Sequence, residues 1–328
     1  MNDARRGPVP VREHLTSSTT KAALLVQQKV LDSVRATLAD SGFVEVAMPL
    51  VGPVTDPGAR GAKQADVEYY GTTYKVMTSA ILYKQAALLT FDRIFSIAPN
   101  LRLEPPETAT TGRHLAEFHQ IDVEMADANR TEAMEVAQAL VRSAVSRVLT
   151  DLSGELEELG RDSGAFAELL DRPFDAITHA DAVVQLVDMG IEQNPEEEIS
   201  WVGEHTLSSK ATRPFFITDY PTGSRGFYDR QDPEKPGTLC NFDLIAPEGF
   251  GELASGSERA YELAEIVDRM RETGENPEKY GWYLELVKSG IRPSAGFGIG
   301  LERLTRYVTG LDEVWQVNAF PKLPGVIQ

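Results

Sequence analysis

Apolar residues recur every three or four positions in some segments of the chain and alternate with polar residues in others. Between positions 30 and 38 they fall on one face of a helix, and Gly42 can end that helix. Residues 43–49 alternate as a strand does, and Pro49 stops the pattern. The chain therefore predicts a helix over 21–42 followed directly by a strand.

Strands and helices then follow in mixed order, beginning with a hairpin around Gly71. A capping box at Thr178 predicts the start of one helix, and Thr131 is the expected cap of another. Strands separated by turns, with helices in the middle, favour an α+β fold on an antiparallel sheet flanked by helices. We expect a flexible tail over 1–20, a single catalytic domain over 21–328 and a polar surface segment over 191–210. The predicted strands cover 91–104, 117–125, 213–221, 237–249 and the start of 295–308, and the predicted helices cover 79–90, 131–148, 154–160, 181–190, 257–273, 277–288 and the end of 295–308.

The composition is ordinary for a globular protein, with 42% hydrophobic and 25% charged residues among 328. The single cysteine, Cys240, excludes an intrachain disulfide and fits a reducing compartment. The N-terminal segment lacks the apolar core of a signal peptide, and no apolar run approaches the length of a membrane span. These features predict a cytoplasmic protein with no membrane contact.

The net charge is −18, and such a field repels a polyanion unless a local basic patch opposes it. No basic run longer than Arg5-Arg6 is present. The charge can simply serve solubility, but it also leads us to expect that tRNA is an unlikely partner.

A first set of chemically capable residues lies around two predicted strands joined by a loop. Arg102 and Glu104 point the same way on a strand, since side chains alternate. A guanidinium can grip a phosphate, a carboxylate can accept from an amine, and Phe118 can stack on a base. An isolated Arg-x-Glu, however, is usually a solvated surface pair.

A second set is the glycine-rich run that begins at Gly296 and leads to Arg303. Glycines let a backbone approach a ligand closely, although the same run suits tight packing of a strand on a helix. A third set is Asp243, Glu252 and Arg259. Two carboxylates suit Mg²⁺, which takes one or two carboxylates with substrate phosphates, but the three residues could equally form an ordinary salt bridge.

Taken together and in order, these segments resemble the catalytic core of class II aminoacyl-tRNA synthetases of the aspartyl and asparaginyl branch. The matching segments are RHLAEFHQIDVEM, FFITDYP, NFDLIAPEGFGELASGSER and YGWYLEL…GFGIGLERL, within a resemblance that covers about residues 21–328. The resemblance implies ATP as a substrate, Mg²⁺ as a cofactor, and a homodimer whose interface contains the helix 21–42, the strand 43–48 and Pro49.

The resemblance also implies roles for individual residues in binding ATP. Arg102 matches the arginine on the α-phosphate and acts in catalysis with Arg303, on the opposite side of ATP. Glu104 matches the residue that binds the adenine amine, and Phe118 matches the ring stacked on adenine.

The terminal phosphates and the metal have their own matches. Arg113 and His114 match the loop pair that holds the terminal phosphates. Asp243 and Glu252 match the carboxylates that bind Mg²⁺, and Glu252 thereby also contributes to ATP binding.

For the amino acid, the resemblance implies a pocket that contains Ser79, Lys84, Asp122 and Arg259. Lys84 matches a lysine of the aspartyl type, absent from the asparaginyl branch, that pairs with the substrate's carboxylate. Asp122 matches the aspartate that holds the substrate's ammonium, and Arg259 matches the arginine that binds the carboxylate. Two cations around one small ligand imply aspartate over asparagine. Considered without the flanking matches, Lys84 fits an exposed lysine on a helix, and Asp122 fits a carboxylate at the end of a strand. Ile81 departs from the family, which usually has glutamine there.

The predicted core begins almost at the N-terminus, which leaves no room for the anticodon-binding barrel of the tRNA ligases. The chain therefore most resembles the archaeal-type, AMP-forming asparagine synthetase, which implies that aspartate is adenylated and that ammonia attacks to give asparagine. Two alternatives stay open. The acceptor can be another amine, a carrier or tRNA, or the chain can be a paralogue with a regulatory role.

Overall fold

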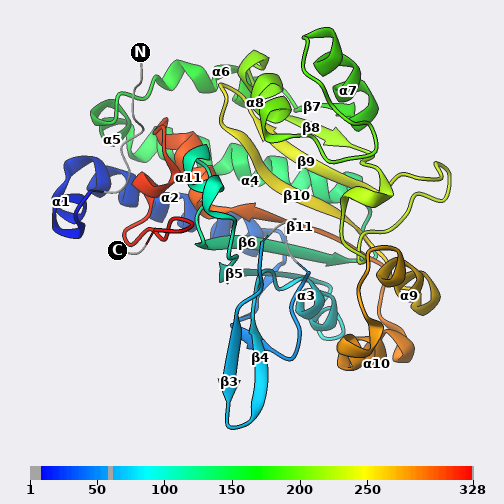
Figure 1. Cartoon of the computed structure of the whole chain (residues 1–328). Coiled ribbons are helices and arrows are strands. Elements are labelled where there is room, and N and C mark those ends of the chain that lie inside the picture. The colour runs from blue at the N-terminus through cyan, green and yellow to red at the C-terminus, as the bar shows by residue number, and fades with distance from the viewer. Residues whose placement is uncertain (1–8, 58–61, 327–328) are drawn as a thin grey trace.

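The computed structural model describes residues 9–57 and 62–326, and an eight-stranded sheet forms its centre (Figure 1). The middle strands pair antiparallel, while the outermost pair at each edge is parallel. This arrangement, with helices around the sheet, confirms the predicted α+β fold. The strands run in the order β1 (Val44–Glu45), β5 (Arg93–Leu101), β6 (Glu117–Ala126), β11 (Ser294–Gly300), β10 (Gly251–Arg259), β9 (Asn241–Ala246), β8 (Phe215–Thr218) and β7 (Asp175–Thr178).

A second, three-stranded sheet consists of β2 (Val51–Gly52), β4 (Thr72–Val76) and β3 (Asp66–Tyr69), in that order. Its hairpin projects from the body of the molecule (Figure 1). The turn places Tyr70 and Gly71 at φ values of 46° and 86°, a left-handed conformation that suits two-residue hairpin turns. The predicted hairpin is confirmed.

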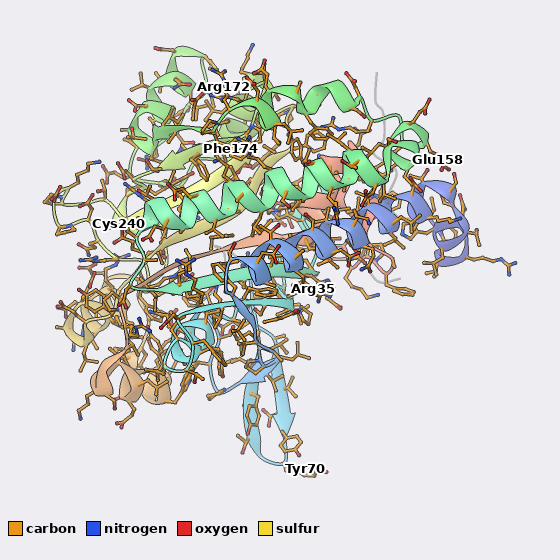
Figure 2. All side chains as sticks on the ribbon, turned by 180° about the vertical axis from the view of Figure 1, so that it is seen from behind. Arg35, Tyr70, Glu158, Arg172, Phe174 and Cys240 are labelled. Atoms are coloured by element: carbon orange, nitrogen blue, oxygen red, sulfur yellow. The ribbon has the colours of Figure 1, made fainter. Side chains whose placement is uncertain are left out.

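Two long helices, α2 (Ser18–Asp40) and α4 (Arg130–Asp151), run side by side across the back of the sheet (Figure 2). The apolar face of α2 is buried there, as its spacing predicts, and α4 buries alanine, valine and leucine in the same core. Ser143 of α4 is hydrogen-bonded at 2.8 Å to both Ser33 and Thr37 of α2. The main core of the protein lies between this helix pair and the sheet.

Smaller helices cover the edges and ends of the sheet. None of the helices within the described ranges is long and apolar enough to cross a membrane. The smaller helices are α1 (Val11–Thr16), α3 (Ile81–Ala87), α5 (Ser153–Glu158), α6 (Ala167–Asp171), α7 (His179–Asp188), α8 (Trp201–Lys210), α9 (Leu263–Glu272), α10 (Gly281–Gly290) and α11 (Leu301–Thr309). The 3₁₀ turns are η1 (Pro106–Thr111), η2 (Ser163–Phe166), η3 (Thr222–Ser224), η4 (Pro277–Tyr280) and η5 (Val314–Val317).

Several predicted boundaries are wrong. Residues 257–259 continue strand β10 rather than begin a helix, because they pair with both β9 and β11. The strand expected over 43–49 is reduced to the two residues of β1. The cap of α4 is Asn129 rather than Thr131, because the Asn129 side chain accepts from the backbone of Glu132 and the Glu132 side chain accepts in return.

Two segments are more ordered than their polarity indicates. Part of the expected tail forms α1, whose His14 is buried and contacts the backbone of Asn318, while residues 1–8 lie outside the described ranges. The expected surface segment over 191–210 contains α8. Its Glu204 is buried against strand β10, and that contact brings the helix to the site described next.

Candidate active site

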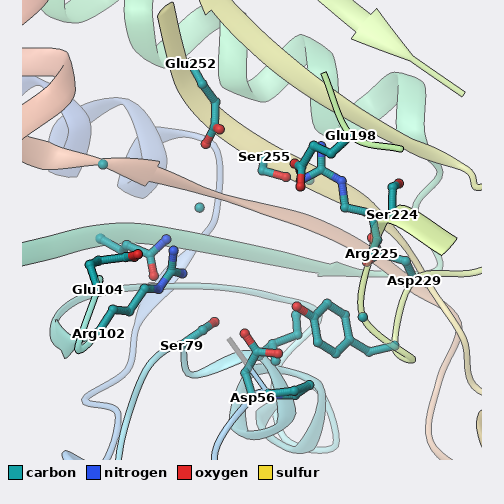
Figure 3. Close-up of a pocket in the computed structure, with 18 of the residues that line it drawn as sticks. Asp56, Ser79, Arg102, Glu104, Glu198, Ser224, Arg225, Asp229, Glu252 and Ser255 are labelled. Carbon is teal, nitrogen blue, oxygen red and sulfur yellow. The ribbon is translucent and has the colours of Figure 1, made fainter. Parts of the chain in front are cut away.

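A large cavity of about 1120 Å³ opens on the face of the sheet opposite α2 and α4. Side chains from β6, β10, β11 and α3 meet there with loops and α8 (Figure 3). Figure 3 shows Arg102 and Glu104 on one side of the open space and Arg225 on the other. All of the site residues predicted from the sequence line this cavity except Asp243, which is buried beneath it.

Arg102, Glu104 and Phe118 form one end of the cavity. The Arg102 guanidinium carbon lies 5.1 Å from the centre of the Phe118 ring, and its Nε donates to the Thr78 carbonyl at 3.2 Å. Burial raises the pKa of Glu104, while the positive charges of Arg102 and Arg303 oppose that rise. An aromatic ring, a guanidinium and a carboxylate at one place can hold a flat, amine-bearing base.

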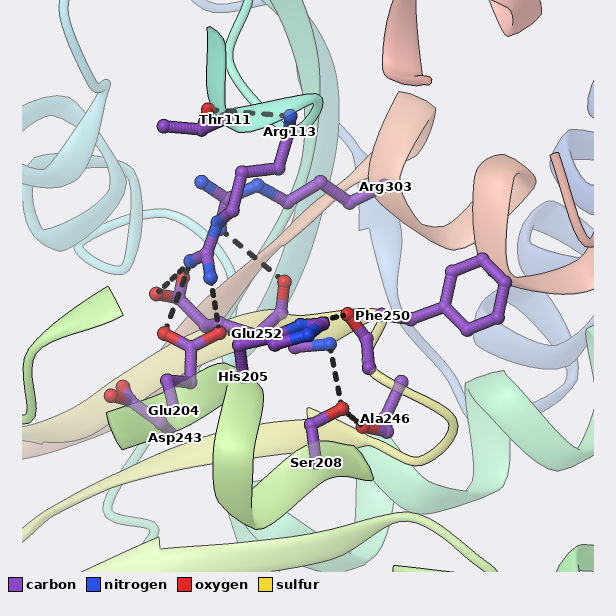
Figure 4. Close-up of polar contacts among 12 residues, drawn as sticks. Thr111, Arg113, Glu204, His205, Ser208, Asp243, Ala246, Phe250, Glu252 and Arg303 are labelled. Carbon is purple, nitrogen blue, oxygen red and sulfur yellow. Dashed lines mark hydrogen bonds and ion pairs between the residues drawn. The ribbon is translucent and has the colours of Figure 1, made fainter. Parts of the chain in front are cut away.

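Arginines concentrate in the next part of the cavity (Figure 4). Arg113 forms a bidentate pair with Glu204, with Nη1–Oε1 and Nη2–Oε2 distances of 2.5 and 3.1 Å. Arg303 Nη1 lies 3.1 Å from Glu252 Oε1, and Arg113 Nη2 lies 3.9 Å from Glu252 Oε2. Burial lowers the pKa of His114 to about 3, and Arg303 and Arg113 add to the effect. His114 is therefore neutral near pH 7 and contributes a hydrogen bond rather than a charge.

Asp243 and Glu252 lie on the neighbouring antiparallel strands β9 and β10. Asp243 Oδ2 accepts from Arg225 at 2.5 Å, and Arg225 also pairs with Glu198 at 2.6 Å. Burial raises the pKa of Asp243 to about 7, against the opposing effect of Arg225. Burial also raises the pKa of Glu252, but Arg303 and other arginines outweigh it and lower that pKa to about 2.

This pair of carboxylates fits a magnesium ion. Asp243 Oδ1 is buried and has no hydrogen-bond partner among the described residues, which leaves an oxygen for a further ligand. Glu252 is ionised at neutral pH and faces the cavity. Mg²⁺ takes one or two carboxylates and completes its shell with water and phosphate oxygens.

The other end of the cavity holds a buried network of charges. Lys84 Nζ lies 2.8 Å from Asp122 Oδ1 and 3.7 Å from Glu124 Oε2. Arg259 donates to both oxygens of Glu124 at 2.9 and 3.1 Å, and its Nη1 lies 3.4 Å from Asp229 Oδ1. Lys84 is only 2% exposed, so it is not an ordinary surface lysine. Asp122 Oδ2 is buried without a partner within the described ranges, and this oxygen can receive an ammonium.

Ile81, Ser79 and Ser294 border this network. Ile81 is buried, lines the cavity and packs into the cluster that contains Tyr283. Ser79 lines the cavity beside it, and Ser294 donates to Glu124 at 3.1 Å. An apolar side chain at position 81 makes this wall of the pocket less polar than the family pattern implies.

Several residues of the site were not predicted from the sequence. Glu124 could have been found, because alternation along β6 places it on the same face as Asp122. Arg225 and Asp229 belong to an irregular loop with no periodic pattern. Glu204 lay in a segment that polarity assigned to the surface.

Comparison with known proteins places these features in one family. The family described as tRNA synthetases class II (D, K and N) matches residues 13–324. The asparagine–tRNA ligase of Thermococcus gammatolerans is 32% identical over 311 residues, 95% of this chain and 71% of that protein. The corresponding ligase of Thermus thermophilus is 32% identical over 309 residues, 92% of this chain and 69% of that protein. The crystal structure of asparaginyl-tRNA synthetase from Pyrococcus horikoshii, complexed with asparaginyl-adenylate, aligns with a TM-score of 0.91 at 30% identity, covering 97% of this chain and 72% of that one.

These relatives overturn two expectations. Ammonia as the acceptor, with aspartate converted to asparagine, is wrong, because the similar proteins are named as tRNA ligases rather than AMP-forming asparagine synthetases. That expectation rested on where the predicted core begins in the chain, and this position does not specify the acceptor. The expectation that tRNA is an unlikely partner is also wrong. Net charge sums the whole chain and does not describe the charge of any one surface. The prediction of aspartate over asparagine is not among these: it rested on Lys84 and Arg259, and in the structure both cations face buried carboxylates.

Proposed function

Because the chain belongs to the class II tRNA synthetases of the D, K and N branch, we propose that it is an ATP-dependent ligase that activates asparagine as its adenylate and transfers it to tRNA. One observation carries the proposal. A single cavity joins a set of arginines suited to a triphosphate with a pocket of balanced charges suited to a small amino acid.

In the first step, an oxygen of the amino acid's carboxylate attacks the α-phosphorus of ATP, and pyrophosphate leaves. Arg102 and Arg303 are positioned to stabilise the charge that develops on the α-phosphate, while Arg113 and neutral His114 hold the terminal phosphates. Asp243 and Glu252 would hold Mg²⁺, which supplies positive charge to the leaving pyrophosphate. In the second step, a tRNA hydroxyl attacks the acyl carbon and AMP leaves.

The charges around Lys84 and Arg259 support asparagine as the amino acid. Burial raises the pKa of Asp229, and Arg259 opposes the rise. Even if Asp229 is protonated, Asp122 and Glu124 balance the two cations. No positive charge is then left over for a second substrate carboxylate, whereas an amide side chain adds no charge, and the substrate ammonium can bind Asp122 Oδ2.

The test is ATP–pyrophosphate exchange with asparagine or aspartate as the only amino acid, followed by charging of total tRNA with the better substrate. We expect exchange with asparagine at least tenfold faster than with aspartate, and asparagine recovered on tRNA. Faster exchange with aspartate would contradict the balance of charges. Exchange without tRNA charging would remove tRNA as the acceptor.

The location we propose is the cytoplasm, where tRNA ligases find their substrates. The only cysteine, Cys240, is buried and is not part of a disulfide, which supports a reducing compartment.

A further inference from the structure

The pairing of Arg113 with Glu204 is specific in its geometry. Glu204 lies on α8, is 7% exposed, and binds the two terminal nitrogens of the guanidinium end-on. One oxygen of the same carboxylate also accepts from the backbone N–H of Glu252 at 2.5 Å. The carboxylate is therefore fixed by the main chain of β10 and can in turn fix the arginine.

The backbone of β10 makes room for this contact at Gly251. A Cβ there would lie 2.3 Å from Glu204 Oε1 and 2.9 Å from Arg113 Nη1, and the residue has a φ of 77°. Any side chain would displace the pair, and the left-handed conformation also disfavours one. The strand is thus shaped so that Glu204 and Arg113 meet directly over Glu252 (Figure 4).

One edge of the Arg113 guanidinium remains unused. Its Nε is buried and has no hydrogen-bond partner in the part of the chain that the structure describes, although Arg113 lines the cavity. A buried donor without a partner is unfavourable, so a ligand that accepts from it binds more tightly. Because Glu204 takes the terminal nitrogens end-on, the edge that contains Nε is left for the ligand.

We propose that Glu204 is a positioning residue that holds Arg113 so that its Nε edge meets a terminal phosphate of ATP. This inference rests on the proposed function, since that function places the terminal phosphates beside Arg113. The proposal also assigns a function to α8, which lies in a segment for which the sequence predicted only a polar surface position. The group recognised is the β- or γ-phosphate, so the effect of Glu204 is confined to ligands that carry one.

The test compares the binding of ATP and AMP, measured by calorimetry with Mg²⁺ and without amino acid. Glu204→Asp keeps the charge but is one methylene too short to reach both terminal nitrogens. We expect ATP affinity to fall at least fivefold and AMP affinity to change less than twofold. An equal fall for both nucleotides, or an unchanged ATP affinity, would overturn the proposal. If Glu204→Asp does not fold, Glu204→Gln keeps the size with one acceptor oxygen, and the ratio of ATP to AMP affinity should still fall at least threefold.

The chain offers a matched control in Glu248, which forms the same bidentate pair with Arg161 at 2.8 and 2.9 Å but does not line the cavity. Glu248→Asp should leave both affinities within twofold.

In an Arg113→Ala background, adding Glu204→Asp should change ATP affinity less than twofold, because Glu204 acts through Arg113. A further fivefold loss would show a separate role for Glu204. Binding requires no activation of asparagine, so the expected pattern in a protein without pyrophosphate exchange would support this inference and reject the proposed function. A protein that binds no ATP would reject both.

Discussion

His114 is a histidine that the fold keeps uncharged. It lies half-buried near Arg113 and Arg303, and Thr111 Oγ1 is hydrogen-bonded to its Nδ1 at 2.5 Å. Burial lowers its pKa from the ordinary 6.5 to about 3, and the two arginines add to that effect. Between these two values the unfolded chain binds a proton that the folded protein does not, so His114 makes the protein less stable as the pH falls.

The sign of this effect gives a prediction for the ligand-free protein. Between pH 7 and pH 5, the parent should lose up to about 2 kcal/mol of unfolding free energy through His114, since one pKa unit corresponds to about 1.4 kcal/mol. His114→Gln should not show this loss. Urea unfolding of both proteins at the two pH values measures the difference, in which other titrating groups cancel. His205→Gln, at an exposed position, controls for the loss of an imidazole. Equal pH dependence of His114→Gln and the parent would refute the assigned environment.

At this scale the sequence identifies side chains better than their partners. Arg102, Arg303 and Asp122 were predicted from motifs and do lie at one cavity. The pairing of Lys84 with Asp122 and Glu124 could not be predicted, because it depends on how deeply α3 packs against β6. That burial changes Lys84 from a free cation into half of an ion pair, and the inferred substrate changes with it.

At the scale of elements, α4 depends on its first turn. Asn129 Oδ1 accepts from the Glu132 backbone at 3.1 Å, and Glu132 Oε2 accepts from the Asn129 backbone at 3.0 Å. The next backbone N–H, that of Arg130, donates to Glu258 on β10. The capped end of α4 is therefore joined to the central sheet.

Loss of this cap should be measurable. Asn129→Ala should lower the free energy of unfolding by about 1 kcal/mol, because the backbone N–H of Glu132 loses its acceptor. Asn129→Ser should recover most of that loss. Thr131→Ala, at the exposed position that the sequence favours as the cap, should cost under about 0.5 kcal/mol. Urea denaturation compares the three variants. A larger cost at Thr131 than at Asn129 would contradict the capping geometry.

Elements with a clear period of apolar residues or a clear turn signal were predicted from the sequence. Elements whose structure depends on pairing with neighbouring strands were not. The spacing in α2 and the turn at Gly71 are local signals, and both elements form as expected. Residues 257–259 carry serine, glutamate and arginine, which suit a helix equally well. They become a strand because β9 and β11 lie on either side and supply its hydrogen bonds. Such tertiary context is not contained in a local pattern.

At the scale of the whole molecule, apolar side chains are exposed on α2 and on the short strands that follow it. Leu25, Val44, Leu50 and Val51 are between 38% and 54% exposed. Leu25 and Val44 lie in the segments that the family resemblance assigns to the dimer interface, and Leu50 and Val51 follow these segments directly.

We therefore expect a homodimer with twice the 36.1 kDa mass of one chain by light scattering at micromolar concentration. Leu50→Arg should shift the protein toward the monomer, because it places a charge among apolar neighbours. Val187→Arg, at a comparably exposed position on α7, should leave the mass unchanged. A monomeric parent protein would refute the prediction.

The order of strands in the sheet has a consequence for synthesis on the ribosome. Strand β6 pairs along one side with β5, which precedes it closely, but its other side pairs with β11, which begins at Ser294. At elongation rates of about 5–20 residues per second, that side stays uncovered for roughly 10–30 s. Asp122 and Glu124 lie on β6 and their partner Lys84 is made before them, whereas Arg259, the second partner of Glu124, is the last residue of β10. The nascent chain can therefore form the first ion pairs of this network early, but Glu124 gains Arg259 only when most of the chain has been made.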